Sequence, residues 1–124
     1  MVNIIIQVET CTLHFRPYEF IINTNNRSYG YEIDVWSTGC IIGQILGGEC
    51  LFQGTSSDEV IKDMCKKLGT PKNVNKNYQY IGFPDLEEKY PKELELIYKM
   101  LKYDIKERIS MAEALLYWDT HIIS

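Results

Sequence analysis

Apolar residues fill nearly every position of residues 31–47, over more than three turns of a helix. They recur three or four positions apart on more than one side, so no wide polar face remains for water. Gly39 and Gly43 stand four residues apart and would let a neighbouring element approach closely. Glycine and β-branched residues have weak helix propensity, so the pattern predicts a central helix stabilised by packing on all sides. Gly47 and Gly48 are its stop signals.

Capping signals predict two of the remaining helices. Ser56 and Glu59 form a capping-box pattern ahead of apolar residues at helical spacing, and Gly69 ends that run. Ser110 and Glu113 repeat the pattern before the last apolar run of the sequence. The predicted helices cover residues 17–23, 31–47, 57–68, 93–102 and 111–117.

Two segments lack helical spacing. Residues 3–8 are a short apolar run that either forms a β-strand or lies extended on the helical body. Residues 72–91 are rich in asparagine, glycine and proline, and we expect a loop there. With 124 residues, the chain has room for one core, so we expect a single, mainly α-helical domain.

Composition narrows the class of protein mainly by exclusion. A formal net charge of −4 argues against a general nucleic-acid surface. The apolar run near the N-terminus is too short for a signal peptide or a membrane span, so neither secretion nor a membrane is implied. The cysteines lack metal-ligand spacing and are expected to be reduced, which favours a cytoplasmic or nuclear location. They are Cys11, Cys40, Cys50 and Cys65.

The start of the central segment carries a family signature. Asp34-Val-Trp-Ser-Thr-Gly-Cys-Ile-Ile resembles the motif that opens the central helix of the C-terminal lobe in eukaryotic protein kinases. The resemblance implies that Asp34 holds the backbone of the catalytic loop, and that Asp34 and Trp36 anchor the central helix. Considered without the resemblance, Asp34 has another explanation, because a carboxylate in the first turn accepts backbone N–H bonds at the positive helix end.

The segment Glu9–Glu19 resembles the peptide-binding loop of cyclin-dependent-kinase-like kinases. It keeps five residues of that motif: Glu9, Thr12, Leu13, Arg16 and Glu19. The resemblance implies that Thr12, Leu13 and Arg16 belong to a substrate loop. Pro17 and Tyr18 replace the alanine and proline of the family's A-P-E element. Gln7 stands where activated relatives carry a phosphorylated threonine, so that switch is absent.

Two charged residues far apart in the sequence are expected to pair. Glu19 stands at the glutamate of the A-P-E element and Arg108 at the arginine of the family's D-P-x-x-R element. The resemblance implies a buried ion pair that clamps the substrate loop to the helical body. Phe20 and Ile109 flank the two charges and favour their burial, whereas two separate surface charges are the alternative.

Two later motifs narrow the resemblance to one group of kinases. Leu68-Gly-Thr-Pro71 matches the L-G-T-P of kinases related to cyclin-dependent kinases and glycogen synthase kinase, the CMGC group. Residues 96–110 resemble the run L-L-x-x-M-L-x-Y-D-P-x-x-R-I-S, with Ile105 in place of the proline. The resemblance implies that residues 1–124 are a partial kinase domain, the truncated C-terminal helical lobe around its central buried helix.

The catalytic motifs of the family are not found in this sequence. It contains no H-R-D, no D-F-G and no G-x-G-x-x-G. The complete family uses ATP and magnesium, but we expect no cofactor, metal or catalytic residue in this chain and no phosphotransferase activity from it alone. Neither His14 nor His121 has a serine or cysteine in the sequence context of a nucleophile elbow.

Three functions remain open at this point. The chain is part of a serine/threonine kinase whose other part is encoded elsewhere, a pseudokinase-like module that binds protein partners or substrates, or a gene remnant without function. Protein partners are expected in the first two cases, and nucleic acid and membranes in none. The sequence leaves the oligomeric state open.

Overall fold

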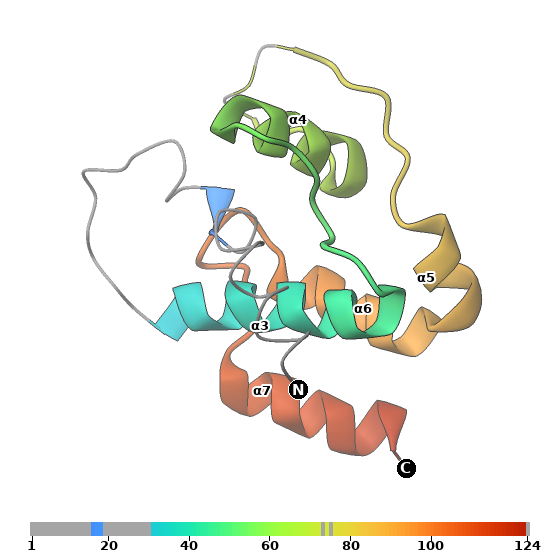
Figure 1. The fold of residues 1–124 in the computed structure, drawn as a ribbon. Helices are drawn as coiled ribbons and strands as arrows, with labels where there is room; N and C mark the ends of the chain where they lie inside the picture. The colour runs from blue at the N-terminus through green and yellow to red at the C-terminus, as the bar shows by residue number, and fades with distance from the viewer. Residues whose placement is uncertain (1–15, 19–30, 73, 75, 124) are drawn as a thin grey trace.

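The fold comes from a computed structural model, which describes residues 16–18, 31–72, 74 and 76–123. Within these ranges every regular element is a helix, which confirms the mainly α class. The elements are α3 (Tyr31–Gly47), α4 (Ser57–Leu68), α5 (Pro84–Lys89), α6 (Pro91–Met100), α7 (Met111–Tyr117) and the π-helical segment η2 (Trp118–Ile122). In Figure 1, α3 runs through the middle of the molecule, with α4 above it and α7 below.

Helix α3 has the predicted bounds and contacts its neighbours closely at its two glycines. A methyl group added at Gly39 would lie 3.0 Å from the Met100 Cβ, and one at Gly43 would lie 2.5 Å from the Leu51 side chain. The absence of side chains at these positions therefore lets α6 and the segment after α3 lie directly against the helix.

The packing of α3 differs from the prediction on one side. Its buried residues include Val35, Trp36 and Cys40, but Ile45 is 69% exposed. Asp34 and Tyr31 are exposed as well. The described residues therefore do not bury this helix on all sides, although its sequence is apolar nearly all round.

The capping signals produce two related but different helix starts. The Ser110 side chain accepts from the Glu113 N–H and the Glu113 side chain accepts from the Ser110 N–H, which completes the capping box of α7. At α4 the Ser56 hydroxyl accepts from the Glu59 N–H, but the Glu59 carboxylate bonds to the N–H and hydroxyl of Thr55 instead. Hydrogen bonds from the Thr55 backbone and then its hydroxyl lower the pKa of Glu59.

One predicted element differs from the structure, and two others fall wholly or partly outside the described residues. The expected loop over residues 72–91 is wrong at its C-terminal end, because α5 forms there. Pro84 begins α5 and Pro91 begins α6, positions where proline lacks only an N–H that has no partner within the helix. The predicted helix at residues 17–23 lies outside the described residues from position 19 on, and so does the whole of segment 3–8.

The prediction of reduced cysteines holds for Cys40 and Cys65. Both are buried thiols, and burial raises the pKa of both. Cys50 is disulfide-bonded, so the prediction is wrong for this residue. Cys11 lies outside the described residues.

The described helices share two groups of buried side chains. The larger group joins α3, α4 and α6 and includes Trp36, Phe52, Met64 and Ile97. The smaller group lies between α3, α6 and α7 and consists of Val35, Leu96, Met100 and Ala114. No helix in the described ranges combines the length and the hydropathy needed to cross a membrane.

Candidate functional site

Arg108 is the buried charge around which the candidate site is built. It is 7% exposed, and its Nε and Nη2 donate to the Lys102 carbonyl oxygen at 3.0 and 2.8 Å. Its Nη1 donates to the Glu32 carbonyl oxygen at 2.9 Å. One guanidinium therefore joins the segment after α6 to the first turn of α3, with the forked geometry that suits arginine.

A tight turn after α6 brings Arg108 into this position. The Asp104 carbonyl oxygen accepts from the N–H groups of Glu107 and Arg108 at 3.0 and 3.1 Å. The Asp104 carboxylate also accepts from the Lys106 N–H at 2.9 Å, as short polar residues do in turns. Ile105, at the position where the resembling motif has proline, is 44% exposed on the outside of this turn.

A series of aromatic contacts begins at the guanidinium. Arg108 lies over the Trp36 ring, 5.1 Å from its centroid, and Trp36 is fully buried. The Trp36 ring stacks on Phe52 at 6.2 Å, and Tyr103 lies at 6.2 Å from it in a tilted arrangement. The Tyr103 ring in turn meets Tyr18 edge-on at 5.2 Å. We call Tyr18, Trp36, Tyr103 and Arg108 the Arg108 site.

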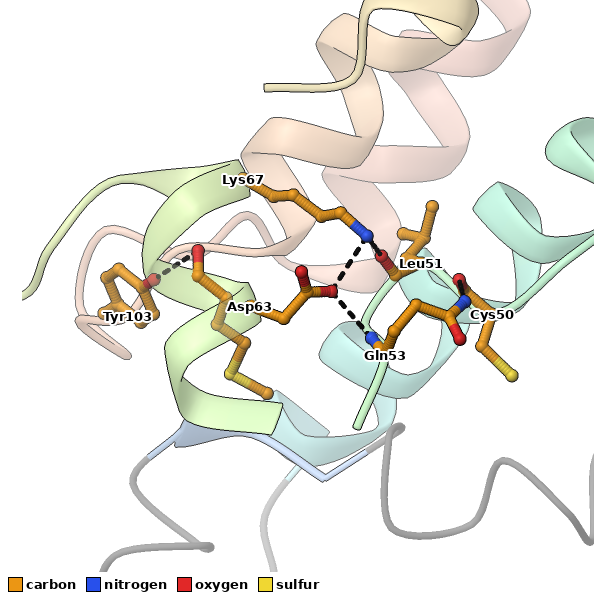
Figure 2. Close-up of polar contacts among 7 residues, drawn as sticks. Cys50, Leu51, Gln53, Asp63, Lys67 and Tyr103 are labelled. Atoms are coloured by element: carbon orange, nitrogen blue, oxygen red, sulfur yellow. Dashed lines mark hydrogen bonds and ion pairs between the residues drawn. The ribbon is translucent and has the colours of Figure 1, made fainter. Parts of the chain in front are cut away.

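The Arg108 site is also tied to α4. The Tyr103 hydroxyl donates to the carbonyl oxygens of Gly69 and Met64, at 2.8 and 3.2 Å. Figure 2 shows Tyr103 beside α4, with its hydroxyl directed towards the helix backbone. Burial is the main cause that raises the pKa of this hydroxyl above its ordinary value. The tyrosine is therefore a neutral hydrogen-bond donor at physiological pH.

A second polar network fixes the other side of α4. The Asp63 carboxylate accepts from the Gln53 N–H at 2.6 Å and from the Lys67 ammonium at 2.8 Å. The Lys67 ammonium donates further to the Leu51 carbonyl oxygen at 2.5 Å. In Figure 2 these side chains point from α4 towards the segment that follows α3. These bonds hold the segment that follows α3 against α4.

The predicted site residues fall into two groups. Trp36 and Arg108 lie together, whereas Arg16 is exposed and Asp34 is exposed on α3. Thr38 donates its hydroxyl to the Asp34 carbonyl oxygen at 2.7 Å, which concerns the backbone of Asp34 and not its carboxylate. The remaining predicted residues lie outside the described ranges; they are Thr12, Leu13 and Glu19.

Sequence reasoning missed three residues that shape this region. Tyr103 and Tyr18 meet across a long sequence separation, for which no local pattern exists. Asp63 could have been noticed, because it stands four residues before Lys67 on a predicted helix and such pairs attract each other. Among the described residues, no group of three His, Cys, Asp or Glu side chains could hold a metal ion.

Comparison with known proteins places this arrangement in a family. The chain matches the family described as "Protein kinase domain" over residues 3–117. It is 40% identical over 116 residues to the candidate serine/threonine-protein kinase L268 of Acanthamoeba polyphaga mimivirus, with 85% of this chain and 20% of the relative covered. It is 32% identical over 120 residues to protein kinase gsk3 of Schizosaccharomyces pombe, with 85% of this chain and 30% of the relative covered.

A solved structure shows the same fold. A chain of the yeast RNA Pol II CTD kinase CTDK-1 complex superposes with a TM-score of 0.71 at 27% identity, over 84% of this chain and 40% of that chain. The curated relatives named above are three to five times longer than the stretch they share with this chain, since the match covers 20 to 30% of their length. The chain therefore belongs to the protein kinase domain family and comprises part of the helical lobe of a CMGC-like serine/threonine kinase domain.

Proposed function

We propose that this chain is the substrate-side lobe of a CMGC-type serine/threonine protein kinase and that it has no phosphotransferase activity by itself. In this proposal residues 1–124 form one partial kinase domain, without the nucleotide-binding lobe, the catalytic loop and the metal-binding motif. The lobe positions a protein substrate, and phosphoryl transfer requires groups that this sequence does not contain.

The Arg108 site is the observation that supports this proposal. Its guanidinium is held by two backbone carbonyl groups and lies over a buried ring, and these contacts fix its position. Tyr18 is buried and meets Tyr103 edge-on, and Glu19 is the next residue in the sequence. A carboxylate that reaches Arg108 can form two parallel bonds with its guanidinium.

The proposal assigns roles to the residues around this clamp. Glu19 and Arg108 form the ion pair that holds the substrate loop, and Thr12, Leu13 and Arg16 belong to the loop itself. Arg16 is exposed directly before buried Pro17, which suits a side chain that faces a substrate. In the same proposal Asp34 and Trp36 anchor the central helix.

The sequence lacks the motifs that phosphoryl transfer by a kinase requires. Phosphoryl transfer depends on charge placement around magnesium and the γ-phosphate, supplied in kinases by the motifs that are missing here. The proposal therefore assigns no ATP-dependent or magnesium-dependent step to this chain.

A protein-binding module is the second candidate function. Leu115, Leu116 and Ile123 are 62%, 64% and 66% exposed at the C-terminal end of the described chain. Leu115 and Leu116 both belong to α7, and exposed apolar side chains on one helix favour contact with another protein. In this alternative the lobe competes for the partners or substrates of complete kinases.

Nucleotide binding and peptide phosphorylation test the proposal directly. The purified chain is titrated with magnesium-ATP in a calorimeter and incubated with a peptide substrate, and fission yeast gsk3 is the positive control. We expect no heat of binding and no phosphorylated peptide. Magnesium-dependent ATP binding at micromolar level would overturn the proposal, and so would phosphorylation that persists after contaminating kinases are removed.

A further inference from the structure

A wide groove lies between the segment after α4 and the C-terminal end of α6. Its volume of about 760 Å³ falls within the range of roughly 300 to 1,000 Å³ that is typical of ligand-binding sites. Buried Pro71 lines it on the α4 side and buried Leu101 on the α6 side. We call it the tyrosine groove, because four of the side chains that line it are tyrosines: Tyr18, Tyr80, Tyr98 and Tyr103.

Packing holds two of these rings in place before any ligand binds. Tyr18 is buried and meets Tyr103 edge-on, with 5.2 Å between the ring centroids. The Tyr103 hydroxyl is occupied by the carbonyl oxygens of Gly69 and Met64, so Tyr103 offers the groove its ring and not a polar group. Tyr80 is 60% exposed, and most of its ring is therefore accessible to a ligand.

The other two tyrosines form a hydrogen-bonded pair. The Tyr98 hydroxyl donates to the Tyr80 oxygen, and burial followed by this bond raises the pKa of Tyr98, so Tyr98 stays the donor. Gly82 leaves room for the pair, because a methyl group there would lie 3.3 Å from the Tyr80 oxygen and 3.5 Å from the Tyr98 oxygen. The Tyr80 hydroxyl keeps one proton that this bond does not use, and it can donate that proton to a ligand.

Four exposed charged side chains line the rest of the tyrosine groove: Lys72, Lys102, Asp104 and Glu107. The two ammonium groups can only donate hydrogen bonds, as the Tyr80 proton does. Asp104 already accepts from the Lys106 N–H at 2.9 Å, which leaves Glu107 as the clearer partner for a cation. The groove therefore favours a ligand with hydrogen-bond acceptors, apolar faces for the rings and one positive charge.

A proline-rich peptide segment combines these properties. Its rings present apolar faces to aromatic side chains, and proline has no N–H, so the segment brings carbonyl acceptors without donors that would need partners. In the polyproline II conformation these carbonyl groups have no internal bonds, and the segment is ordered before it binds. Aromatic-lined grooves of several peptide-binding domains use this conformation. An α-helix fits less well, because most of its carbonyl groups are bonded within the helix.

We propose that the tyrosine groove binds a proline-rich peptide segment in the polyproline II conformation, followed by an arginine or lysine that pairs with Glu107. The proline rings lie on Tyr80 and Tyr98, and the carbonyl groups of the peptide accept from the Tyr80 hydroxyl and from the lysines. The inference goes beyond the proposed function, because this binding needs no phosphoryl transfer and applies equally to a kinase lobe and to a protein-binding module.

Two neighbouring residues provide a matched pair of variants. Tyr80 lines the tyrosine groove and Ile81 does not, although they are 60% and 51% exposed. Tyr80→Ala removes the ring and the donor, Tyr80→Phe removes the donor alone, and Ile81→Ala is the control. Glu107→Gln removes the negative charge from the groove. Its control is Glu88→Gln, because Glu88 is also exposed but belongs to α5 outside the groove.

The probe is a peptide library with the pattern Pro-x-x-Pro-x-Arg, in which x is any residue, and the matched library has alanine in place of both prolines. The chain should retain peptides from the proline library only. For the best of them, Tyr80→Ala should weaken binding by about tenfold or more, since the ring is the main contact. Tyr80→Phe and Glu107→Gln should each weaken it about threefold, as expected for one polar contact. Both control variants should bind like the unchanged chain.

Three results would overturn the inference. The chain retains no peptide at millimolar concentration, or retains as many from the alanine library. Tyr80→Ala binds the selected peptide as well as the unchanged chain does. Tyr80→Ala and Ile81→Ala weaken binding equally, which would place the peptide outside the groove. If Tyr80→Ala lowers the melting temperature, Tyr80→Phe decides instead, and unchanged affinity of that variant at an unchanged melting temperature would exclude the groove as the site.

Discussion

Arg108 has an unusual position for an arginine, because its guanidinium is buried and bonded to backbone carbonyl groups of two segments. We predict that Arg108→Ala lowers the free energy of unfolding by about 3 kcal/mol or more, since both carbonyl groups lose a charged donor and Trp36 loses its partner. Arg108→Lys should recover less than half of this loss, because one ammonium cannot reproduce the forked contacts. Urea unfolding of the three proteins measures both effects.

The pairing of Glu19 with Arg108 stays a prediction, because Glu19 lies outside the described residues. If the pair is buried, Glu19→Ala is also severe, at about 3 to 5 kcal/mol, and the double variant is clearly less than additive. Effects that are mild and additive would show that Pro17 and Tyr18 have moved the loop away from the clamp. An exposed pair is worth under about 1 kcal/mol, so the two outcomes are well separated.

Tyr103 should make stability depend on alkaline pH. Burial keeps the pKa of its hydroxyl above the ordinary value of 10.0, so the unfolded chain loses this proton at a pH where the folded chain retains it. The stabilising contribution is therefore complete below about pH 10 and falls as the pH rises further. Cys40 contributes in the same direction from its ordinary value of 9.0, because burial also raises the pKa of this thiol.

Tyr103→Phe separates the tyrosine from the other alkaline groups. At pH 7 it should cost about 1 to 2 kcal/mol, since the carbonyl groups of Gly69 and Met64 lose their donor. Above pH 10 its stability should fall less steeply than that of the unchanged chain. Tyr31→Phe is the control, because Tyr31 is 86% exposed and the substitution should leave the stability at pH 7 unaltered. Equal slopes for all three proteins would exclude this role of Tyr103.

The helices themselves were largely predictable from local signals. The bounds of α3, α4 and α7 agree with the prediction because each has a stop or a cap in the sequence, such as Ser110 and Glu113 for α7. Helix α5 was missed because Pro84 was read as part of a loop, whereas proline is favoured in the first turn of a helix. Helix α6 begins two residues earlier than predicted for the same reason, at Pro91.

The candidate site was predictable only where a family motif names its residues. Trp36 and Arg108 were singled out by resemblance, and the structure places them 5.1 Å apart, measured from the guanidinium carbon to the ring centroid. The contact of Tyr103 with Tyr18 depends on the path of the chain between them, which no helical or capping pattern specifies. The exposure of Ile45 was missed because an apolar pattern shows which side chains can be buried and not which of them the fold covers.

The glycines of α3 allow a test of packing at the level of the element. Gly43→Ala puts a methyl group 2.5 Å from the Leu51 side chain and should cost about 1 to 3 kcal/mol through overpacking. Gly47→Ala is the matched control, because its methyl group lies 3.6 Å from the nearest atom, in the Leu86 side chain. That control should be neutral or gain up to about 1 kcal/mol from helix propensity. Similar values for both variants would mean that the segment after α3 shifts without strain.

The two groups of buried side chains are joined in the whole molecule. Ile42 packs against both of them, and α3 and α6 contribute side chains to each. A change in one group therefore alters helices that the other group also needs. We expect the chain to unfold as one cooperative unit, as most domains of this size do.

The two tryptophans report separately on the two groups. Trp36 belongs to the larger group and Trp118 packs against the smaller one. Trp118→Phe leaves only the signal of Trp36, and Trp36→Phe leaves only that of Trp118. In each variant, urea unfolding followed by tryptophan fluorescence should have the same midpoint and slope as unfolding followed by circular dichroism, because shared helices couple the groups.

Trp36→Phe should lower the urea midpoint that both signals report, since Arg108 loses the indole ring beneath it. A Trp118 signal that changes at clearly lower urea than the helical signal would show instead that α7 detaches before the rest of the lobe unfolds.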